Sequence, residues 1–132
     1  MTTVTLNISR TAQSGYTLAT DIQPHTERTY YYQYTGGNTS NNNGDVQTNT
    51  GTPIDFTVSL GMPAGSYEIK KVNFIGNANN DGSADVAGGK QSATIHDKAE
   101  HKGEITYCLK IEDIGDPNGR CTFDCDPKII NQ

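Results

Sequence analysis

Ile54-Asp55-Phe56-Thr57-Val58-Ser59-Leu60 is the stretch that decides the fold class. Its four apolar residues alternate strictly with polar ones, so in an extended strand the apolar side chains all point to one face. A helix would require apolar residues at a longer spacing. The stretch therefore predicts a strand with one buried face, in a sheet that packs against a second layer.

Similar alternation recurs on both sides of this stretch, in segments separated by turn-forming residues. Residues 36–51, for example, are mostly Gly, Asn, Thr and Ser, which is typical of a loop. Short strands with such connections favour an all-β fold, and we expect a single antiparallel β-sandwich of about seven short strands. Together with residues 54–60, the expected strands are residues 4–8, 27–35, 67–70, 72–75, 92–95 and 105–111, with a bulge at Lys71.

The composition narrows the classes of function. The chain has 132 residues, of which 33% are hydrophobic, and a net charge of −5. This size suits one domain over residues 1–132. An acidic chain without a basic stripe is a poor partner for nucleic acid. No segment reaches the length of a membrane span and the N-terminus lacks a signal-peptide pattern, so we expect no membrane partner and a cytoplasmic location.

The cysteines are Cys108, Cys121 and Cys125, which is an odd number and too few for a disulfide framework. Cys108 lies in a predicted strand, and three residues separate the other two. This spacing, with no second Cys or His pair nearby, gives little support for a zinc site. We expect reduced thiols.

An Asp-Pro bond, Asp116-Pro117, follows the last predicted strand. Acid breaks Asp-Pro bonds more easily than any other ordinary peptide bond, because the Asp carboxyl can attack its own backbone carbonyl and form a five-membered anhydride. The proline nitrogen is protonated more easily than other amide nitrogens and leaves as a secondary amine. Intramolecular attack in a held geometry can reach an effective molarity of about 10⁵ M or more. A fold that holds Asp116 in this geometry could therefore cut its own backbone.

The same residues also suit a plain turn, because proline presets φ and the flanking Gly115 and Gly119 tolerate positive φ. A second Asp-Pro pair, Asp126-Pro127, follows ten residues later. If the first bond were cut, residues 117–132 would be a C-terminal tail that is either released or retained by pairing as a strand.

A charged segment, His96-Asp97-Lys98-Ala99-Glu100-His101-Lys102, holds six ionisable side chains in seven positions. If Lys98 reached Asp116, its neutral amine could attack the anhydride and leave an isopeptide cross-link. His96 could then carry the proton, while an acidic neighbour positions water. The alternative is a solvated turn between two strands.

The segment Asn80-Asp81-Gly82-Ser83-Ala84-Asp85 resembles part of a calcium loop. It lacks a full ligand series and the closing bidentate Glu, so an ordinary turn is expected. The chain also lacks a nucleophile-elbow motif and a glycine-rich phosphate loop. We therefore expect neither a metal nor an organic cofactor.

The stretch from Tyr107 to Pro117, with His96-Asp97-Lys98 upstream, resembles the DP-EP family, small bacterial proteins regarded as self-cleaving Asp-Pro endopeptidases. The resemblance extends over the whole chain in length and strand layout. It implies that Asp116 carries the carboxyl at the cut and that Pro117 becomes a new N-terminus. It further implies a β-sandwich, a link between Lys98 and Asp116, and self-assembly.

These observations predict an autoproteolytic, aspartic-type endopeptidase that cuts its own Asp116-Pro117 bond and has itself as substrate and partner. The expected catalytic residues are Asp116, Pro117, Lys98 and His96. The alternative is a non-catalytic β-sandwich module for binding or assembly, in which the Asp-Pro pair only turns the chain.

Overall fold

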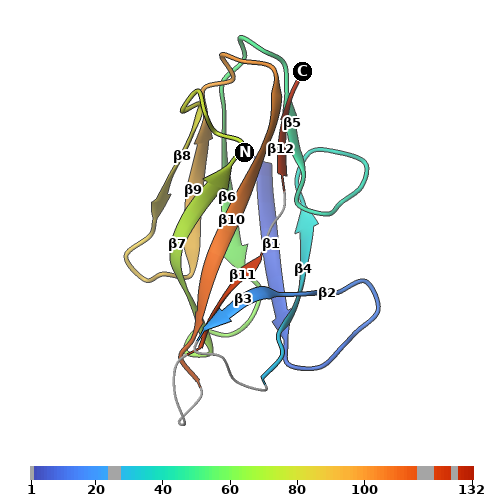
Figure 1. Cartoon of the computed structure of the whole chain (residues 1–132), viewed down its shortest axis with the longest axis vertical. Coiled ribbons are helices and arrows are strands. Elements are labelled where there is room, and N and C mark those ends of the chain that lie inside the picture. Colours follow the sequence, from blue (N-terminus) through green and yellow to red (C-terminus); the bar gives the residue numbers. More distant parts are fainter. Residues whose placement is uncertain (1, 24–27, 116–120, 126–127) are drawn as a thin grey trace.

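Two sheets of β-strands make up the structure (Figure 1). The computed structural model describes residues 2–23, 28–115, 121–125 and 128–132, and these contain twelve strands and no helix. The all-β, sandwich-like fold predicted from the alternation is confirmed. None of the described residues belongs to a helix long and apolar enough to cross a membrane.

The first sheet is built around β1 (Thr2–Ser9) and β6 (Ile54–Leu60), which pair in parallel. Val4, Leu6, Phe56 and Val58 are buried, and the residues that alternate with them are not, as the sequence pattern predicts. The order across this sheet is β2 (Thr17–Leu18), β4 (Tyr31–Gly36), β1, β6, β9 (Ser92–Asp97) and β8 (Gly82–Val86).

The second sheet is built around β10 (Gly103–Asp113). β7 (Tyr67–Ile75) pairs along one edge of β10, with a register shift between Lys110 and Ile111 that skips Lys70, one residue before the bulge predicted at Lys71. Along the other edge, β11 (Thr122–Cys125) pairs with the C-terminal half of β10 and β12 (Lys128–Asn131) with its N-terminal half. β3 (Thr20–Gln23) then pairs with β11, and β5 (Val46–Thr48) with β12.

The number and direction of the strands differ from the prediction of about seven antiparallel strands. Among the described residues there are twelve strands, and the pairs β1–β6 and β12–β5 are parallel. Alternation shows which face of a strand is buried, but it says nothing about the direction of the neighbouring strand. Strands of two to four residues, such as β2 and β5, are also too short to show a period.

The core lies between the sheets and receives side chains from both of them. The ring of Tyr107 on β10 meets the ring of Phe56 on β6 edge-on, with 5.3 Å between the centroids. The largest fully buried side chains are Tyr30, Tyr107, Phe56, Phe123, Leu6, Ile69, Ile95, Leu109, Ile111, Ile129, Val4 and Val46.

The C-terminal strands are part of this core. Phe123 and Cys125 on β11 and Ile129 on β12 have no exposed surface. Because both strands also pair with β10, the described part of the tail is held by backbone hydrogen bonds and by apolar burial. Removal of this segment would open the second sheet at its centre.

The loop between β4 and β5 turns tightly against the first sheet. Gly44 has a φ of +86°, and a Cβ at this position would lie 2.7 Å from the Cβ of Tyr34. The Tyr107 hydroxyl donates a 2.7 Å hydrogen bond to the carbonyl oxygen of Gly44. These contacts fix the part of the loop that leads into the buried Asp45.

Candidate functional site

The Asp116-Pro117 bond belongs to the connection between β10 and β11, and both of its residues lie outside the described residues. On either side of that connection the chain is anchored. The Asp113 N–H donates a 2.8 Å hydrogen bond to the carbonyl oxygen of Cys121. The N–H groups of Ile114 and Gly115 both donate to the carbonyl oxygen of Ser66, at 3.1 Å. The connection therefore starts and ends at fixed points.

A buried acid lies at the base of this connection. Asp113 is 6% exposed, and its Oδ2 accepts a 2.8 Å hydrogen bond from the Tyr30 hydroxyl. The Tyr30 ring is fully buried and stacks on Phe123 at 4.2 Å. Burial, and next the hydrogen bond to Asp113, raise the pKa of Tyr30 well above its usual value. Tyr30 therefore stays protonated at neutral pH and acts as a hydrogen-bond donor.

Two arginines lie at the same place. Nη1 of Arg28 donates a 3.3 Å hydrogen bond to Sγ of Cys121, the residue that ends the connection. The guanidinium carbon of Arg10 lies 4.8 Å from the centre of the Tyr30 ring. We name Arg10, Arg28, Tyr30, Asp113 and Cys121 the hairpin-base cluster. It offers a proton donor, a carboxylate and positive charge next to the end of β10.

The hairpin-base cluster was not predicted from the sequence, although the sequence contains one signal of it. Asp113 has the same parity as Tyr107, Leu109 and Ile111, so it occupies an inward-facing position of β10. A carboxylate at such a position requires a buried partner. Nothing in the local sequence identifies that partner, because Tyr30 lies 83 residues away along the chain.

The structure does not bring Lys98 to the hairpin-base cluster. Lys98 follows β9, and its N–H donates a 2.9 Å hydrogen bond to the carbonyl oxygen of Asp81, close to the start of β10. Gly115 lies past the other end of β10, where its N–H contacts the carbonyl oxygen of Ser66. β10 has 11 residues, which correspond to a length of about 33 Å. A lysine side chain is far too short to cover that distance.

His96 also lies away from the cluster, on the outer face of the first sheet. Its Nδ1 lies 2.8 Å from Oδ1 of Asp55 on β6, and its Nε2 lies 3.1 Å from Oδ2 of Asp85 on β8. The hydrogen bond to Asp55, and next the one to Asp85, raise the pKa of His96 above its usual 6.5. In this position His96 links three neighbouring strands.

All three cysteines are buried, and none of them forms a disulfide within the described part of the chain. Cys108 lies on β10, Cys125 on β11 and Cys121 directly before β11. The expectation of reduced thiols stays a prediction.

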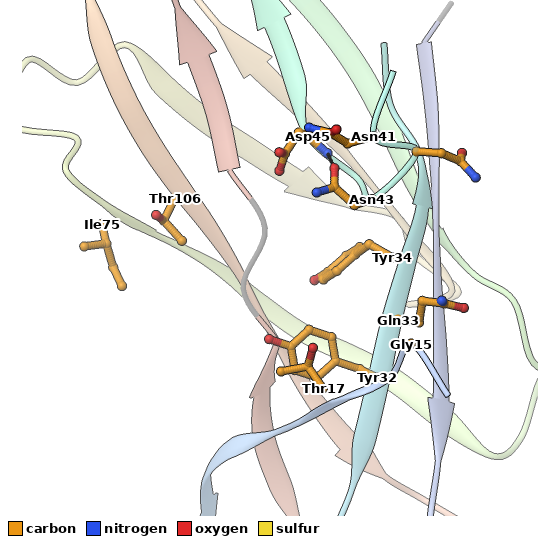
Figure 2. Close-up of a pocket in the computed structure, with 11 residues that line it drawn as sticks. Gly15, Thr17, Tyr32, Gln33, Tyr34, Asn41, Asn43, Asp45, Ile75 and Thr106 are labelled. Carbon is orange, nitrogen blue, oxygen red and sulfur yellow. Dashed lines mark hydrogen bonds between the residues drawn. The ribbon is translucent and has the colours of Figure 1, made fainter. Parts of the chain in front are cut away.

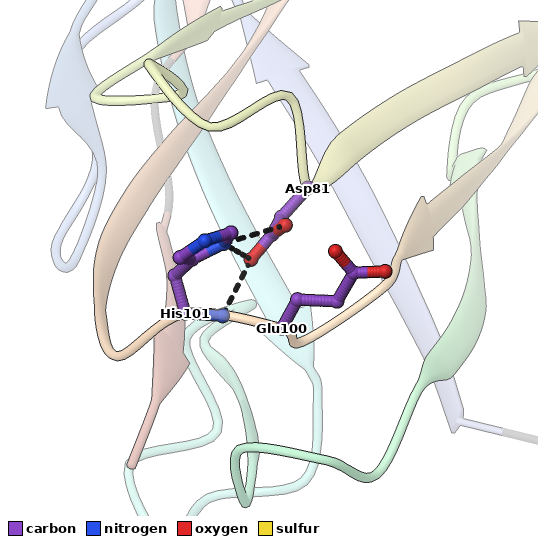
Figure 3. Close-up of side chains that lie close together, drawn as sticks. All are labelled: Asp81, Glu100 and His101. Carbon is purple, nitrogen blue, oxygen red and sulfur yellow. Dashed lines mark hydrogen bonds and ion pairs between the residues drawn. The ribbon is translucent and has the colours of Figure 1, made fainter.

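The segment 80–85 and the charged segment 96–102 meet at the start of β8. Asp81 lies beside Glu100 and His101, which belong to the connection between β9 and β10 (Figure 3). The segment 80–85 was predicted to be a turn, but residues 82–86 form β8. Asp81 thus precedes an edge strand, and its side chain faces the charged connection.

A polar groove with a volume of about 640 Å³ opens beside β4 (Figure 2). Asp45, which is 6% exposed, lines it together with Tyr34 and Asn43. The hydrogen bonds and ion pairs of the described residues include none to the Asp45 carboxylate. The described residues around the groove are Gly15, Thr17, Tyr32, Gln33, Tyr34, Asn41, Asn42, Asn43, Asp45, Ile75 and Thr106.

A scan against models of known protein families found no match, and a search of curated proteins found no similar chain.

Proposed function

We propose that this protein cleaves its own backbone between Asp116 and Pro117 and retains the C-terminal piece. The observation that supports this proposal most is the Tyr30–Asp113 pair, a buried phenol and carboxyl 2.8 Å apart, at the base of the connection that contains the bond. Proton donors and acceptors of this kind assist amide cleavage, typically by about 10²–10⁴-fold.

The proposed reaction has two steps. In the first, an oxygen of the Asp116 side-chain carboxylate bonds to the Asp116 carbonyl carbon. The carbon–nitrogen bond to Pro117 breaks, and the proline nitrogen leaves with a proton as a secondary amine. In the second step, water adds to the cyclic anhydride and opens it, which leaves Asp116 with two carboxyl groups. The overall change is the addition of one water to one peptide bond.

The amine of Lys98 replaces water in a variant of the second step. A neutral lysine amine attacks the anhydride, a carboxylate leaves, and an amide forms with loss of a proton. Because the structure separates Lys98 from Gly115 by the length of β10, we propose that this cross-link joins two copies of the chain. Lys98 is exposed, as an attack on a second copy requires.

The test is the intact mass of freshly purified protein, denatured at neutral pH without heating, because acid and heat break Asp-Pro bonds unaided. The expected products are residues 1–116 and 117–132. The Asp116→Ala variant should remain whole. The Asp126→Ala variant is the matched control, since it removes the other Asp-Pro pair and should still be cut at residue 116. Cleavage of Asp116→Ala at the same bond would overturn the proposal.

The second candidate is a binding module, and the groove beside β4 favours it. A buried carboxylate together with asparagine and tyrosine side chains suits a ligand with several hydroxyl groups, such as a neutral sugar. Amide-resonance shifts on addition of neutral oligosaccharides would test this candidate. Shifts confined to the groove, lost in Asp45→Asn, together with a chain that stays whole over days, would favour binding over cleavage.

A further inference from the structure

We propose that Asp81, Glu100 and His101 form a site for one divalent transition-metal ion, with Zn²⁺ as the best probe. One ligand atom from each of the three residues lies within 4.8 Å of the other two (Figure 3). This site is separate from the hairpin-base cluster, and it goes beyond the proposed self-cleavage.

The backbone holds the two segments of the site together. The Lys98 N–H donates a 2.9 Å hydrogen bond to the carbonyl oxygen of Asp81, and the His101 N–H donates one of 2.9 Å to Oδ2 of Asp81. Between them, Ala99 has a φ of +54° and is completely buried. Its N–H donates to Oδ1 of Asp97 at 2.9 Å. The connection that carries Glu100 and His101 is therefore fixed against Asp81 by backbone contacts, and these do not depend on the Glu100 side chain.

The spacing of the ligand atoms suits a metal. Oδ1 of Asp81 lies 3.2 Å from Nδ1 of His101. Two ligands at about 2.0–2.1 Å from one tetrahedral ion lie at about the same distance from each other. Glu100 is exposed, so its side chain can move toward the other two without breaking core contacts. Asp81, at 2% exposed, is the fixed ligand of the three.

A small cavity adjoins the site. Its volume is about 30 Å³, and Asp81, His101, Asn77 and Asn79 are among the residues that line it. A space of this size holds one water or one ion. The Asn77 side chain is not counted as a metal ligand, because its amide donates a 2.9 Å hydrogen bond to the Gly82 carbonyl oxygen and accepts one of 2.9 Å from the Gly82 N–H. The cavity thus offers room for a water as a fourth ligand, beside Asp81 and His101.

The ligand types select the class of metal. One imidazole nitrogen and two carboxylate oxygens suit Zn²⁺ and its first-row neighbours, which accept mixed nitrogen and oxygen ligands. Ca²⁺ prefers six to eight oxygen ligands and gains little from an imidazole. The partial calcium motif in the sequence therefore marks a metal site of a different kind, because the closing ligands come from another segment.

Calorimetric titration of the untagged chain with ZnCl₂, after removal of metals with EDTA, tests the site. The expected result is one saturable site per chain. Both Glu100→Gln and His101→Ala should weaken binding by about 10-fold or more. Glu100→Gln is the cleaner variant, since it leaves every contact between His101 and Asp81 in place. Circular dichroism establishes that each variant is folded.

His96→Ala is the matched control. His96 also touches two carboxylates, but these lie against opposite ring nitrogens, so no single ion can bind all three. Its removal should leave Zn²⁺ affinity unchanged. The absence of saturable binding to the parent chain, or equal affinity in a folded Glu100→Gln variant, would overturn the site. Titration with Co²⁺ tests whether the metal binds at the cysteines instead. A thiolate-to-metal charge-transfer band would show binding at a cysteine and would overturn the proposed site.

Discussion

The backbone N–H of Asp113 and the carbonyl oxygen of Cys121 form a 2.8 Å hydrogen bond that closes the β10–β11 hairpin. The two residues belong to opposite sides of the Asp116-Pro117 bond. Beyond them, β11 and β12 pair with β10 over most of its length. A break between residues 115 and 121 would therefore leave every described strand in place.

The first prediction concerns the fate of the cut chain. Whether the bond breaks by itself or at an inserted protease site, the two pieces should elute as one species in native gel filtration. They should separate only in denaturant, since Phe123 and Ile129 are fully buried. Separation of the pieces under native conditions would contradict the hydrogen-bonded ladders of β11 and β12.

The variant Phe123→Ala tests whether burial of Phe123 holds the C-terminal piece in place. Loss of a fully buried phenylalanine costs about 3–5 kcal/mol, and Phe123 also stacks on Tyr30. In the cut protein this variant should release the C-terminal piece at a lower urea concentration than the cut parent chain. Thr122→Ala, at a partly exposed position of the same strand, serves as control and should change the midpoint little.

The second prediction concerns the hairpin-base cluster. Tyr30→Phe removes the hydroxyl that donates to Asp113 and leaves a buried carboxyl with one donor fewer. The free energy of unfolding, measured with urea, should fall by about 1–3 kcal/mol. In the double variant Tyr30→Phe/Asp113→Asn, the loss should be smaller than the sum of the two single losses. Simple addition of the two losses would show that the pair is not coupled.

Strands in which apolar and polar residues alternate over many positions could be predicted from the sequence, and β6 is the clearest case. Its expected bounds, residues 54–60, agree with the structure, because its pattern of apolar and polar residues follows directly from the burial of one face of the strand. The bulge in β7 could also be predicted to within one residue, since the extra residue interrupts the alternation of apolar and polar side chains. β8 could not, because Gly82 and Asp85 favour a turn and pairing with β9 overrides that preference.

The candidate sites depend on contacts between distant segments, which local patterns do not contain. The family resemblance implied that Lys98 and the Asp-Pro bond would meet. Lys98 instead precedes β10 and the Asp-Pro bond follows it, so the full length of that strand separates them. Asp81 and His101 were both noticed, yet only the pairing of β8 with β9 brings them together.

The third prediction is a pH dependence carried by His96. Its folded-state pKa is raised, first by the hydrogen bond to Asp55 and then by the bond to Asp85. A raised pKa means that the stabilising contribution is fully present below the unfolded value of 6.5 and is lost as pH rises through the folded value. The His96 side chain is 38% exposed, so the contribution should stay below about 1 kcal/mol.

Urea unfolding of the parent chain and of His96→Gln, compared between about pH 5.5 and 8.5, measures this contribution. The parent should be the more stable of the two at the acidic end, and the difference should shrink toward the alkaline end. Asp55→Asn, which removes the closer carboxylate, should flatten the same dependence. A difference that grows with pH would mean that the neutral imidazole, and not the cation, stabilises the fold.

The fourth prediction concerns the turn at Gly44, whose neighbours Asn43 and Asp45 line the groove. Gly44 and Gly51 both have positive φ, at +86° and +93°. Alanine at either position pays the conformational cost of a left-handed residue, about 1 kcal/mol. A Cβ at Gly51 meets no atom within 4 Å, whereas at Gly44 it lies 2.7 Å from the Cβ of Tyr34. Gly44→Ala should therefore destabilise the fold more than Gly51→Ala.

The difference between the two alanine variants isolates the crowding at Gly44, because the backbone cost is common to both. To relieve the contact, either Tyr34 or the turn must move. Movement of Tyr34 strains the 2.8 Å hydrogen bond that its hydroxyl donates to the carbonyl oxygen of Cys125. Movement of the turn strains the bond from Tyr107 to the Gly44 carbonyl. Urea unfolding that showed equal losses for the two variants would mean that this part of the groove yields freely, and a groove that yields would be a poor preformed site for a sugar.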